Sequence, residues 1–382
     1  MDKTKTIQIS DIGEVITGNT PPRKNPEYYG DYTLFIKPTD ISKDSKYTYN
    51  PEECYSEIGY EKYKKTLIPQ GATCVVTIGS IGEKLTKAHT DCFINQAMNA
   101  VIPNEKYDED YVYYVLKYNL KQLKMFDSGT ASGRENVSKS AFSSININIL
   151  TKKDNQIKVG KILSNYDDLI ENNNKRIKIL EEMAQKIYKE WFVDFKFPNH
   201  ETVTFKQTDL GSEVMPIKGK NITKAIIKKG NVPVVAGGIE PAYYHNIPNT
   251  VAPVITVSAS GANAGYINLY YQDIWASDCS YIDTTMTPYV YYYYLLLKYN
   301  QIKVTNMQRG AAQPHVYPQD LAQLKIKIPE ENVIREFNEI ITPFFSEISN
   351  FSLKNQTLKQ TRDLLLPRLI SGEIDVEKLE IK

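Results

Sequence analysis

Three pairs of short polar loops carry side chains that could hydrogen-bond to base edges or phosphates. The pairs are residues 17–24 with 218–224, 79–83 with 258–265, and 129–136 with 308–315. Arg, Lys, Asn, Gln and Ser are the side chains that read bases in a groove, and Gly allows close approach of the backbone. The candidate contacts are Asn19, Thr20, Arg23, Lys24, Ser80, Arg134, Asn136, Lys218, Lys220, Asn221, Lys224, Ser260, Asn263, Gln308, Arg309 and Gln313. A single such loop could be an ordinary surface turn, but recurrence at equivalent places favours a binding role.

Lysines are concentrated near some of these loops. The whole chain is almost neutral, with 46 Lys and Arg against 45 Asp and Glu. Residues 214–239 nevertheless hold five lysines and no acid, and residues 111–126 hold three lysines and no acid. Such patches would contact phosphates and give salt-dependent binding, although any one surface lysine is more often simply solvated.

No spacing of residues in the sequence is typical of catalysis. Residues 19–22 read NTPP, whereas an adenine methyltransferase would need Asn or Asp, two prolines and an aromatic residue. The nearest match to a phosphate-binding loop, residues 211–220, is followed by Asn221 instead of Ser or Thr. The four cysteines and four histidines lie at no metal-ligand spacing. We therefore expect a recognition chain without a metal or cofactor, whose chemistry is supplied by another chain.

The elements that would position the loops occur twice. Residues 111–119 read YVYYVLKYN and residues 292–300 read YYYLLLKYN, with six of the nine positions identical. Residues 142–150 and 321–329 both alternate apolar and polar residues, which is typical of a strand. Each strand pattern is followed by a long helical pattern. The sequence thus predicts a tandem duplication of a mixed α/β module, each copy followed by a long helix.

Both long helices repeat apolar residues in alternating steps of four and three. The predicted seam positions are Leu163, Ile170, Asn173, Ile177, Leu180 and Ile187 in the first helix and Ile341, Ile348, Asn355, Leu358 and Leu365 in the second. A sustained repeat of 3.5 residues predicts a coiled coil. The alternative is that each amphipathic helix packs only on its own module.

Each seam has one Asn near its middle, and an Asn at such a position fixes the register of a coiled coil. We predict antiparallel pairing with Asn173 opposite Asn355. The same register leaves Tyr166 opposite Arg362 at the rim of the helix pair.

The predicted fold class is α+β, with two related modules joined by an antiparallel coiled coil. The predicted parts are a first module at 1–153, a spacer helix at 154–200, a second module at 201–330 and a second spacer helix at 331–382. Antiparallel pairing implies a pseudo-two-fold axis that holds two modules in opposed directions. That geometry suits the reading of two half-sites on a long regular polymer, for which DNA is the obvious choice.

The sequence also bounds where the chain works. No window approaches the ~18 consecutive apolar residues of a membrane span, and the N-terminal residues MDKTKTIQIS have no apolar core like that of a signal peptide. We therefore expect a cytoplasmic protein without a membrane partner.

Five segments carry a resemblance to the specificity subunit of type I restriction–modification systems, and the resemblance covers essentially the whole chain. IGEVITGNTPPRKNPEYYG (12–30) looks like the entry of a target-recognition domain. VVAGGIEPAYYHN (234–246) and VSASGANAGYI (257–267) look like segments of a second such domain. ILEEMAQKIYKEWFVDF (179–195) is similar to the central conserved helix, and TRDLLLPRLISGEI (361–374) to the family's ending, with Thr361 in place of an apolar residue.

The resemblance implies a function. Each recognition domain would read one half of a bipartite double-stranded DNA target, and the helices would set the spacer and dock two methyltransferase subunits. Those subunits would bind S-adenosylmethionine and methylate adenine, and a restriction subunit would use ATP and Mg to translocate and cut. This chain itself would bind no cofactor and catalyse no step.

Other functions fit part of the same pattern. One is the recognition subunit of a combined cleavage–methylation (type II) system with a single partner, which neighbouring genes would distinguish. Another is a coiled-coil adaptor that binds only proteins, which would shift no DNA with or without partners. A stand-alone DNA-modifying enzyme is disfavoured by the missing cofactor loop.

Overall fold

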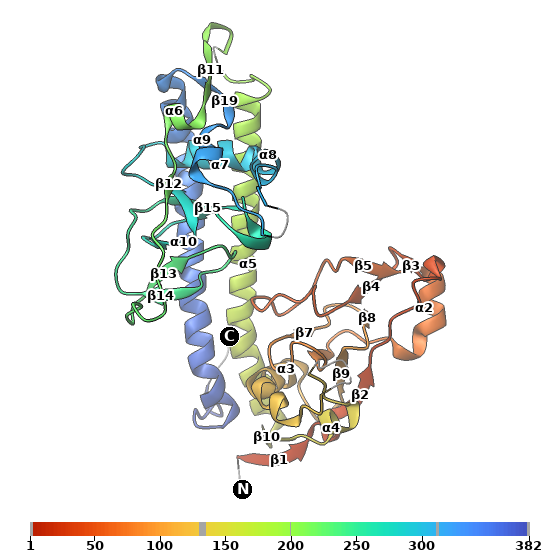
Figure 1. The fold of residues 1–382 in the computed structure, drawn as a ribbon. Helices are drawn as coiled ribbons and strands as arrows, with labels where there is room; N and C mark the ends of the chain where they lie inside the picture. The colour runs from red at the N-terminus through yellow and green to blue at the C-terminus, as the bar shows by residue number, and fades with distance from the viewer. Residues whose placement is uncertain (1–2, 130–134, 199, 311–312, 380–382) are drawn as a thin grey trace. The chain divides into compact units, whose positions relative to one another are not determined.

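The computed structural model describes residues 3–129, 135–198, 200–310 and 313–379 (Figure 1). The chain divides into two compact units: unit 1 combines residues 1–173 with 354–382, and unit 2 comprises residues 174–353. Each unit therefore contains parts of both sequence repeats, because each long helix begins in one unit and ends in the other. None of the helices in the described ranges is both long enough and apolar enough to cross a membrane.

The described part of unit 1 contains three small sheets. Strands β1 and β10 pair antiparallel, an antiparallel sheet has the order β2-β9-β6-β7, and a mixed sheet has the order β3-β5-β4-β8. The strands are β1 (Thr4–Gln8), β2 (Gly13–Thr17), β3 (Tyr29–Gly30), β4 (Thr33–Ile36), β5 (Glu53–Tyr55), β6 (Thr73–Val76), β7 (Leu85–Lys87), β8 (Phe93–Ile94), β9 (Met98–Pro103) and β10 (Asn146–Leu150). The helices before the long one are α1 (Ile9–Ile12), α2 (Glu57–Tyr63), α3 (Glu109–Asn119) and α4 (Lys139–Ser143).

Unit 2 repeats this plan. Strands β11 and β19 pair antiparallel, and the other sheets have the orders β12-β18-β15-β16 and β14-β13-β17. The strands are β11 (Phe205–Asp209), β12 (Ile217–Lys218), β13 (Val232–Val235), β14 (Tyr243–His245), β15 (Val254–Ser258), β16 (Ile267–Tyr270), β17 (Trp275–Ala276), β18 (Cys279–Ile282) and β19 (Lys325–Pro329). The short helices are α6 (Leu210–Glu213), α7 (Val290–Tyr299), α8 (Gln301–Thr305) and α9 (Pro318–Ala322).

The repeated sequences form the repeated elements for clear local reasons. In β10, Ile147 and Ile149 are buried while the two asparagines between and before them are exposed, as the period of two requires. Helix α3 begins where the Asp108 carboxylate accepts a hydrogen bond from the Tyr111 backbone N–H at 2.8 Å. The tyrosine-rich segments form α3 and α7, and most of their rings lie in the cores of their units.

The long helices α5 (Lys153–Phe192) and α10 (Glu331–Ile370) are each 40 residues long. They run side by side and antiparallel in each unit (Figure 1), which confirms the predicted fold class. In unit 1, Asn173 Nδ2 donates a hydrogen bond to Asn355 Oδ1 at 2.8 Å, in the register predicted from the sequence. In unit 2, the Arg176 guanidinium lies 5.6 Å from the centre of the Phe351 ring, which fits the same register. All eleven predicted seam residues are buried or half-buried.

One detail of the predicted register is wrong. Arg362 does not lie at the rim opposite Tyr166: it is only 6% exposed and pairs with the equally buried Asp167. Tyr114 Oη donates to the same carboxylate at 2.6 Å, and Asp363 accepts from Arg362 at 2.7 Å. The four-and-three spacing of the seam does not show which of two adjacent residues, such as Tyr166 and Asp167, points into the helix interface. The sequence pattern therefore does not reveal the pair of Asp167 and Arg362. The matching positions in unit 2, Ala184 and Phe345, are apolar and buried.

Candidate nucleic-acid interface

Two of the predicted loops of unit 1 meet at the connection between β8 and β9, residues 94–98, which we call hub 1. The backbone N–H of Asn19 donates to the carbonyl of Ile94 at 2.9 Å, and Thr20 Oγ1 bonds to the side chain of Gln96. Just before the second loop, the backbone N–H of Thr77 donates to the carbonyl of Ala97 at 2.9 Å. Hub 1 therefore fixes residues 17–20 and 77–80 beside one another.

A buried side chain joins the same two loops from beneath. Thr17 Oγ1 donates to Asn99 Oδ1 at 2.6 Å, and Asn99 Nδ2 donates to Thr77 Oγ1 at 2.8 Å. Asn99 is 2% exposed, and both the oxygen and the nitrogen of its side-chain amide take part in hydrogen bonds inside the protein. This chain of hydrogen bonds joins the base of the first loop to that of the second.

The third loop of unit 1 is attached to the second. The backbone N–H of Gly79 donates to the carbonyl of Glu135 at 3.0 Å, and that of Val137 donates to the carbonyl of Thr77 at 2.8 Å. Asp127 accepts hydrogen bonds from the backbone N–H groups of Asn136 and Gly129, and these bonds lower the pKa of its carboxyl group. The predicted contact Arg134 lies outside the described residues.

Unit 2 repeats the arrangement around hub 2, residues 276–279 between β17 and β18. The backbone N–H of Lys220 donates to the carbonyl of Ala276 at 2.9 Å. In the second loop, Ser260 Oγ bonds to the Asp278 carboxylate, and the N–H of Gly261 donates to the carbonyl of Pro314 in the third loop at 3.1 Å. The three loop pairs found in the sequence therefore converge in the same way in both units.

Each hub requires a glycine at the same place. A Cβ on Gly18 would collide with the backbone carbonyls of Ile94 and Asn95. A Cβ on Gly219 would collide with the carbonyl of Ser277. The first loop can therefore approach each hub only because the residue leaving β2 or β12 lacks a side chain.

Several predicted contacts are engaged within their own unit. Arg23 pairs with Glu53 and lies 4.8 Å from the centre of the Tyr29 ring, and Arg309 pairs with Asp320. Gln308 Nε2 donates to the carbonyl of Ala264 at 2.8 Å. These side chains hold loops in place in the present conformation. Each would have to exchange its partner in order to touch a base.

The other predicted contacts mostly point toward solvent. Lys24, Ser80, Lys218, Lys220, Asn221, Lys224 and Gln313 are exposed, whereas Asn19, Thr20, Asn136, Ser260 and Asn263 are half-buried. Lys224 Nζ lies 5.4 Å from the ring of Tyr243, which is 40% exposed. An exposed ring beside an ammonium group is a surface suited to the sugar–phosphate backbone or to an unstacked base.

Sequence reasoning missed the hubs themselves. Gln96 is exposed at the tip of hub 1, and Asp278 occupies the corresponding part of hub 2. Their position in the sequence could have indicated them, because Gln96 and Asp278 each lie between two short strands at matching places in the two repeats. Because each hub is created by hydrogen bonds to loops that lie 18 to 76 residues away along the chain, no local motif marks it.

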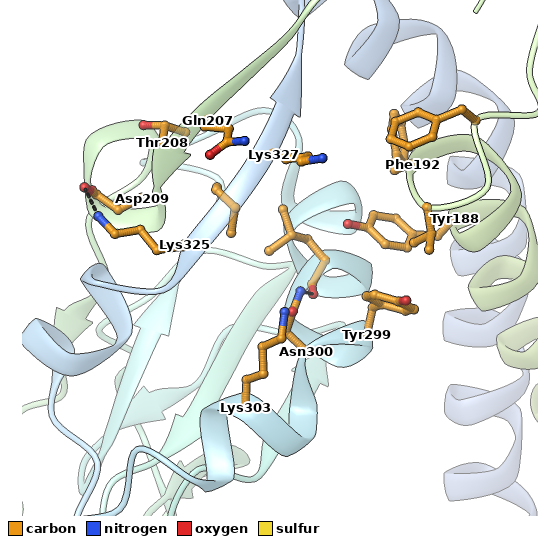
Figure 2. A pocket seen from close by; sticks show the side chains of 14 residues that line it. Tyr188, Phe192, Gln207, Thr208, Asp209, Tyr299, Asn300, Lys303, Lys325 and Lys327 are labelled. Atoms are coloured by element: carbon orange, nitrogen blue, oxygen red, sulfur yellow. Dashed lines mark hydrogen bonds and ion pairs between the residues drawn. The ribbon is translucent and has the colours of Figure 1, made fainter.

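A cavity of about 760 Å³ lies elsewhere in unit 2, between the end of α5 and the β11–β19 pair (Figure 2). Tyr188 and Phe192 form its apolar wall, and Lys303, Lys325 and Lys327 lie on its polar side. Lys325 Nζ is 3.7 Å from an oxygen of Asp209. Three ammonium groups against one carboxylate suit an anion, and the matching strand β10 of unit 1 carries neutral Asn146 and Asn148 in place of two of the lysines.

No group of three or more His, Cys, Asp or Glu side chains in the described part of the chain could hold a metal ion. Three of the four cysteines are buried, and burial raises the pKa of the Cys279 thiol to about 12. This thiol is therefore protonated at neutral pH, and the place of the buried cysteines in the cores fits packing.

Comparison with known proteins gives one consistent family. The type I restriction modification DNA specificity domain matches residues 1–182 and again residues 200–360. The chain is 26% identical to the type I restriction enzyme MjaIX specificity subunit of Methanocaldococcus jannaschii, over 97% of this chain and 94% of the relative. It is 31% identical to the HindI specificity subunit of Haemophilus influenzae over 44% of this chain and 37% of that relative.

The fold is similar to that of a type I restriction–modification S subunit from M. genitalium. The TM-score is 0.63 at 17% sequence identity, and 96% of each chain is covered. At this identity the likeness concerns the fold, which includes the duplicated modules and the paired helices.

Proposed function

Since this chain belongs to the type I restriction–modification DNA specificity family, we propose that each of its two units reads one half of a bipartite DNA target. One observation carries this proposal: the same three loops converge on a hub in both units, although the exposed side chains at the two hubs differ. Two units with the same backbone arrangement but different exposed side chains can read two different half-sites. Phosphate contacts position a protein on DNA in the same way at both, while the different side chains that touch the bases specify the sequence.

Unit 2 has the more basic reading edge. Lys218, Lys220 and Lys224 are exposed on the first loop, where they would pair with phosphates and release counterions. Asn221, between them, offers an amide suited to an adenine edge. At hub 1 the exposed Gln96 offers the same kind of amide. We therefore expect hub 1 and hub 2 to contribute to different halves of the target.

The antiparallel helices would hold the two units at a fixed separation and set the unread gap between the half-sites. In this proposal they also dock two methyltransferase subunits. S-adenosylmethionine would bind to those subunits, and ATP and Mg to a restriction subunit, with no cofactor on this chain. The complex would act in the cytoplasm, where its DNA substrate lies.

Mapping of methylated adenines tests the division of labour. The chain and its methyltransferase subunit would be expressed in a host without adenine methylation, and methylated sites mapped genome-wide. Lys220→Ala with Asn221→Ala should change or relax only one half of the recognised sequence. The reciprocal variant Gln96→Ala should affect only the other half. Changes in both halves by either variant would refute the proposal.

Matched insertions test the spacer. Seven residues added to α5 after Asn173, together with seven added to α10 after Leu353, preserve the heptad pattern and both seams. At 1.5 Å per residue the helix pair would lengthen by about 10 Å, or about 3 base pairs of B-DNA. The gap between the half-sites should increase by about that amount. An unchanged gap in an active complex would show that the helices do not set it.

A further inference from the structure

Unit 1 has an aromatic crevice of about 380 Å³ that is lined by none of the predicted DNA contacts. It is lined by Tyr47, Tyr49, Gln70, Gly71, Lys87, Ala88, His89 and Glu109. The ring centre of Tyr49 lies 5.8 Å from that of Tyr47 and 4.6 Å from that of His89, with interplanar angles of 50° and 55°. Tyr49 is 37% exposed, so part of this aromatic wall is open to solvent.

The lysines at the crevice are already engaged by acids. Lys46 and Lys87 both bind Asp110, at 2.6 and 2.8 Å, and Lys87 also lies 3.4 Å from Glu109. The side chains of the two lysines are almost fully buried, whereas that of Glu109 is 56% exposed. Glu109 therefore presents a carboxylate at the mouth of the crevice.

Helix α5 adds further acids along the adjoining face. Tyr49 Oη donates to Glu171 of this helix at 2.6 Å, and Asp168 lies one turn before Glu171. Burial, reinforced by neighbouring carboxylates, raises the pKa of Asp168 although Lys46 opposes the shift. The four carboxylates Glu109, Asp110, Asp168 and Glu171 therefore outnumber the two ammonium groups of Lys46 and Lys87, which leaves two negative charges in excess among these six groups.

The position of the crevice separates it from the reading edge. Strand β6 runs from Gly71 and Ala72, beside the crevice, toward Thr77 and Ser80 at hub 1. Strand β7 runs the opposite way and delivers Ala88 and His89 to the crevice. The crevice and the hub therefore lie at opposite ends of the same sheet, because strands extend by ~3.3 Å per residue between them. A net negative charge also disfavours phosphates at this place.

We propose that this crevice receives a cationic side chain, arginine or lysine, from the methyltransferase subunit that docks on α5. Aromatic rings attract a cation through their electron-rich faces, and the excess carboxylate charge offsets that of the cation. Asp168 and Glu171 belong to the helix on which docking is proposed, so a docked subunit would have direct access. This inference rests on the proposed docking of that subunit and adds the residues that recognise it.

The test measures assembly of the full chain with its methyltransferase subunit, by the dissociation constant at low and at moderate salt. Glu109→Gln with Asp168→Asn removes the excess charge and leaves the hydrogen bond from Tyr49 to Glu171 in place. We expect at least tenfold weaker assembly at low salt, with a smaller difference at about 300 mM salt because charge attraction is screened. The matched control, Glu57→Gln with Glu61→Gln on the exposed face of α2, should change assembly less than twofold.

Two substitutions of Tyr49 distinguish the contribution of its ring from that of its hydroxyl group. Tyr49→Leu should weaken assembly about as much as the double variant, and Tyr49→Phe should restore most of it because a cation–π contact needs only the ring. Argininamide, a free probe with one guanidinium group, should compete with assembly at millimolar concentration, whereas glutaminamide should not. Far-ultraviolet circular dichroism and the melting temperature would verify that each variant is folded.

Three results would overturn the inference. Unchanged assembly by the folded Glu109→Gln and Asp168→Asn variant would show that the crevice takes no cation from the partner. Weaker DNA binding with normal assembly would assign the site to nucleic acid. Failure of the wild-type chain to assemble with the methyltransferase subunit would instead refute the proposed docking itself, and the crevice's role with it.

Discussion

The buried pair of Asp167 and Arg362 gives a sharp prediction about the helix pair in unit 1. Removing one charge of a buried pair leaves the other in a poorly solvated place, whereas removing both can be nearly neutral. The partners are not equivalent here. Arg362 keeps a second acid, Asp363, at 2.7 Å, while the nearest other cation to Asp167 is Lys117 at 3.9 Å. Loss of Arg362 should therefore cost more than loss of the Asp167 charge.

The expected magnitudes follow from burial. The side chains of Arg362 and Asp167 are 8% and 6% exposed, so Arg362→Met should lower the free energy of unfolding by about 3–5 kcal/mol. Asp167→Asn keeps an oxygen that accepts from Tyr114, and should cost only about 1.5–3 kcal/mol, the value of a hydrogen bond to a charged group. The double variant should be no less stable than Asp167→Asn alone, because Met then replaces a buried cation whose remaining partner, Asp363, is a largely exposed carboxylate.

The assay is urea unfolding of the full chain, followed by circular dichroism at 222 nm and completed as a double-mutant cycle. Because the double variant should cost no more than Asp167→Asn alone, the coupling energy should equal or exceed the cost of Arg362→Met, about 3–5 kcal/mol. Costs that simply add in the double variant would refute the reasoning, as would a cost for Arg362→Met below that for Asp167→Asn. Ala184→Ser, a small change at the matching place in unit 2, controls for general sensitivity of the seam.

Two further predictions concern a titrating group and a glycine. The pKa of Asp168 is raised in the folded state, so ionisation of this carboxyl group destabilises the fold as the pH rises through that pKa. Asp168→Asn removes the ionisation and should therefore raise the melting temperature at pH 7. At pH 3 the carboxyl group is protonated in the folded and unfolded states alike, so the substitution should give no gain there. An equal gain at both pH values would contradict this cause. Gly219→Ala should destabilise the chain by about 1–3 kcal/mol because its Cβ meets the carbonyl of Ser277, and it should abolish reading of one half-site. Gly238→Ala should do neither, because its Cβ would make only an ordinary contact, 3.5 Å from the carbonyl oxygen of Glu240.

The pairing of the two long helices could be predicted because it depends on a repeat that is visible within each helix. A 3.5-residue repeat marks the seams, and one Asn in each helix fixes the register, so the contact between Asn173 and Asn355 was accessible from the sequence. The grouping of distant segments into compact units could not be predicted in this way. Residues 354–382 belong to unit 1 together with residues 1–173, and the order of the sequence repeats does not reveal that grouping.

The candidate interface could be predicted only as a set of loops. Gly-rich and amide-rich stretches show which loops recur, but the partners that engage their side chains lie far away along the chain. Glu53 is 30 residues from Arg23, and Gln96 is 76 residues from Thr20. Long-range pairing of this kind depends on strand order, which short mixed sheets do not reveal by periodicity.

The composition of unit 1 has a consequence for its synthesis. Leu366, Leu369 and Ile370 of α10, with Val376, belong to the same apolar core as Ile9 and Leu163. They leave the ribosome about 200 residues after Leu163, which at ~5–20 residues per second is roughly 10–40 s later. During that interval the nascent first module presents an uncovered apolar surface. Unit 1 is the first unit to be synthesised and the last to be completed. A chain that ends before Leu366 would therefore lack part of the core of unit 1, although all the strands of that unit would be present.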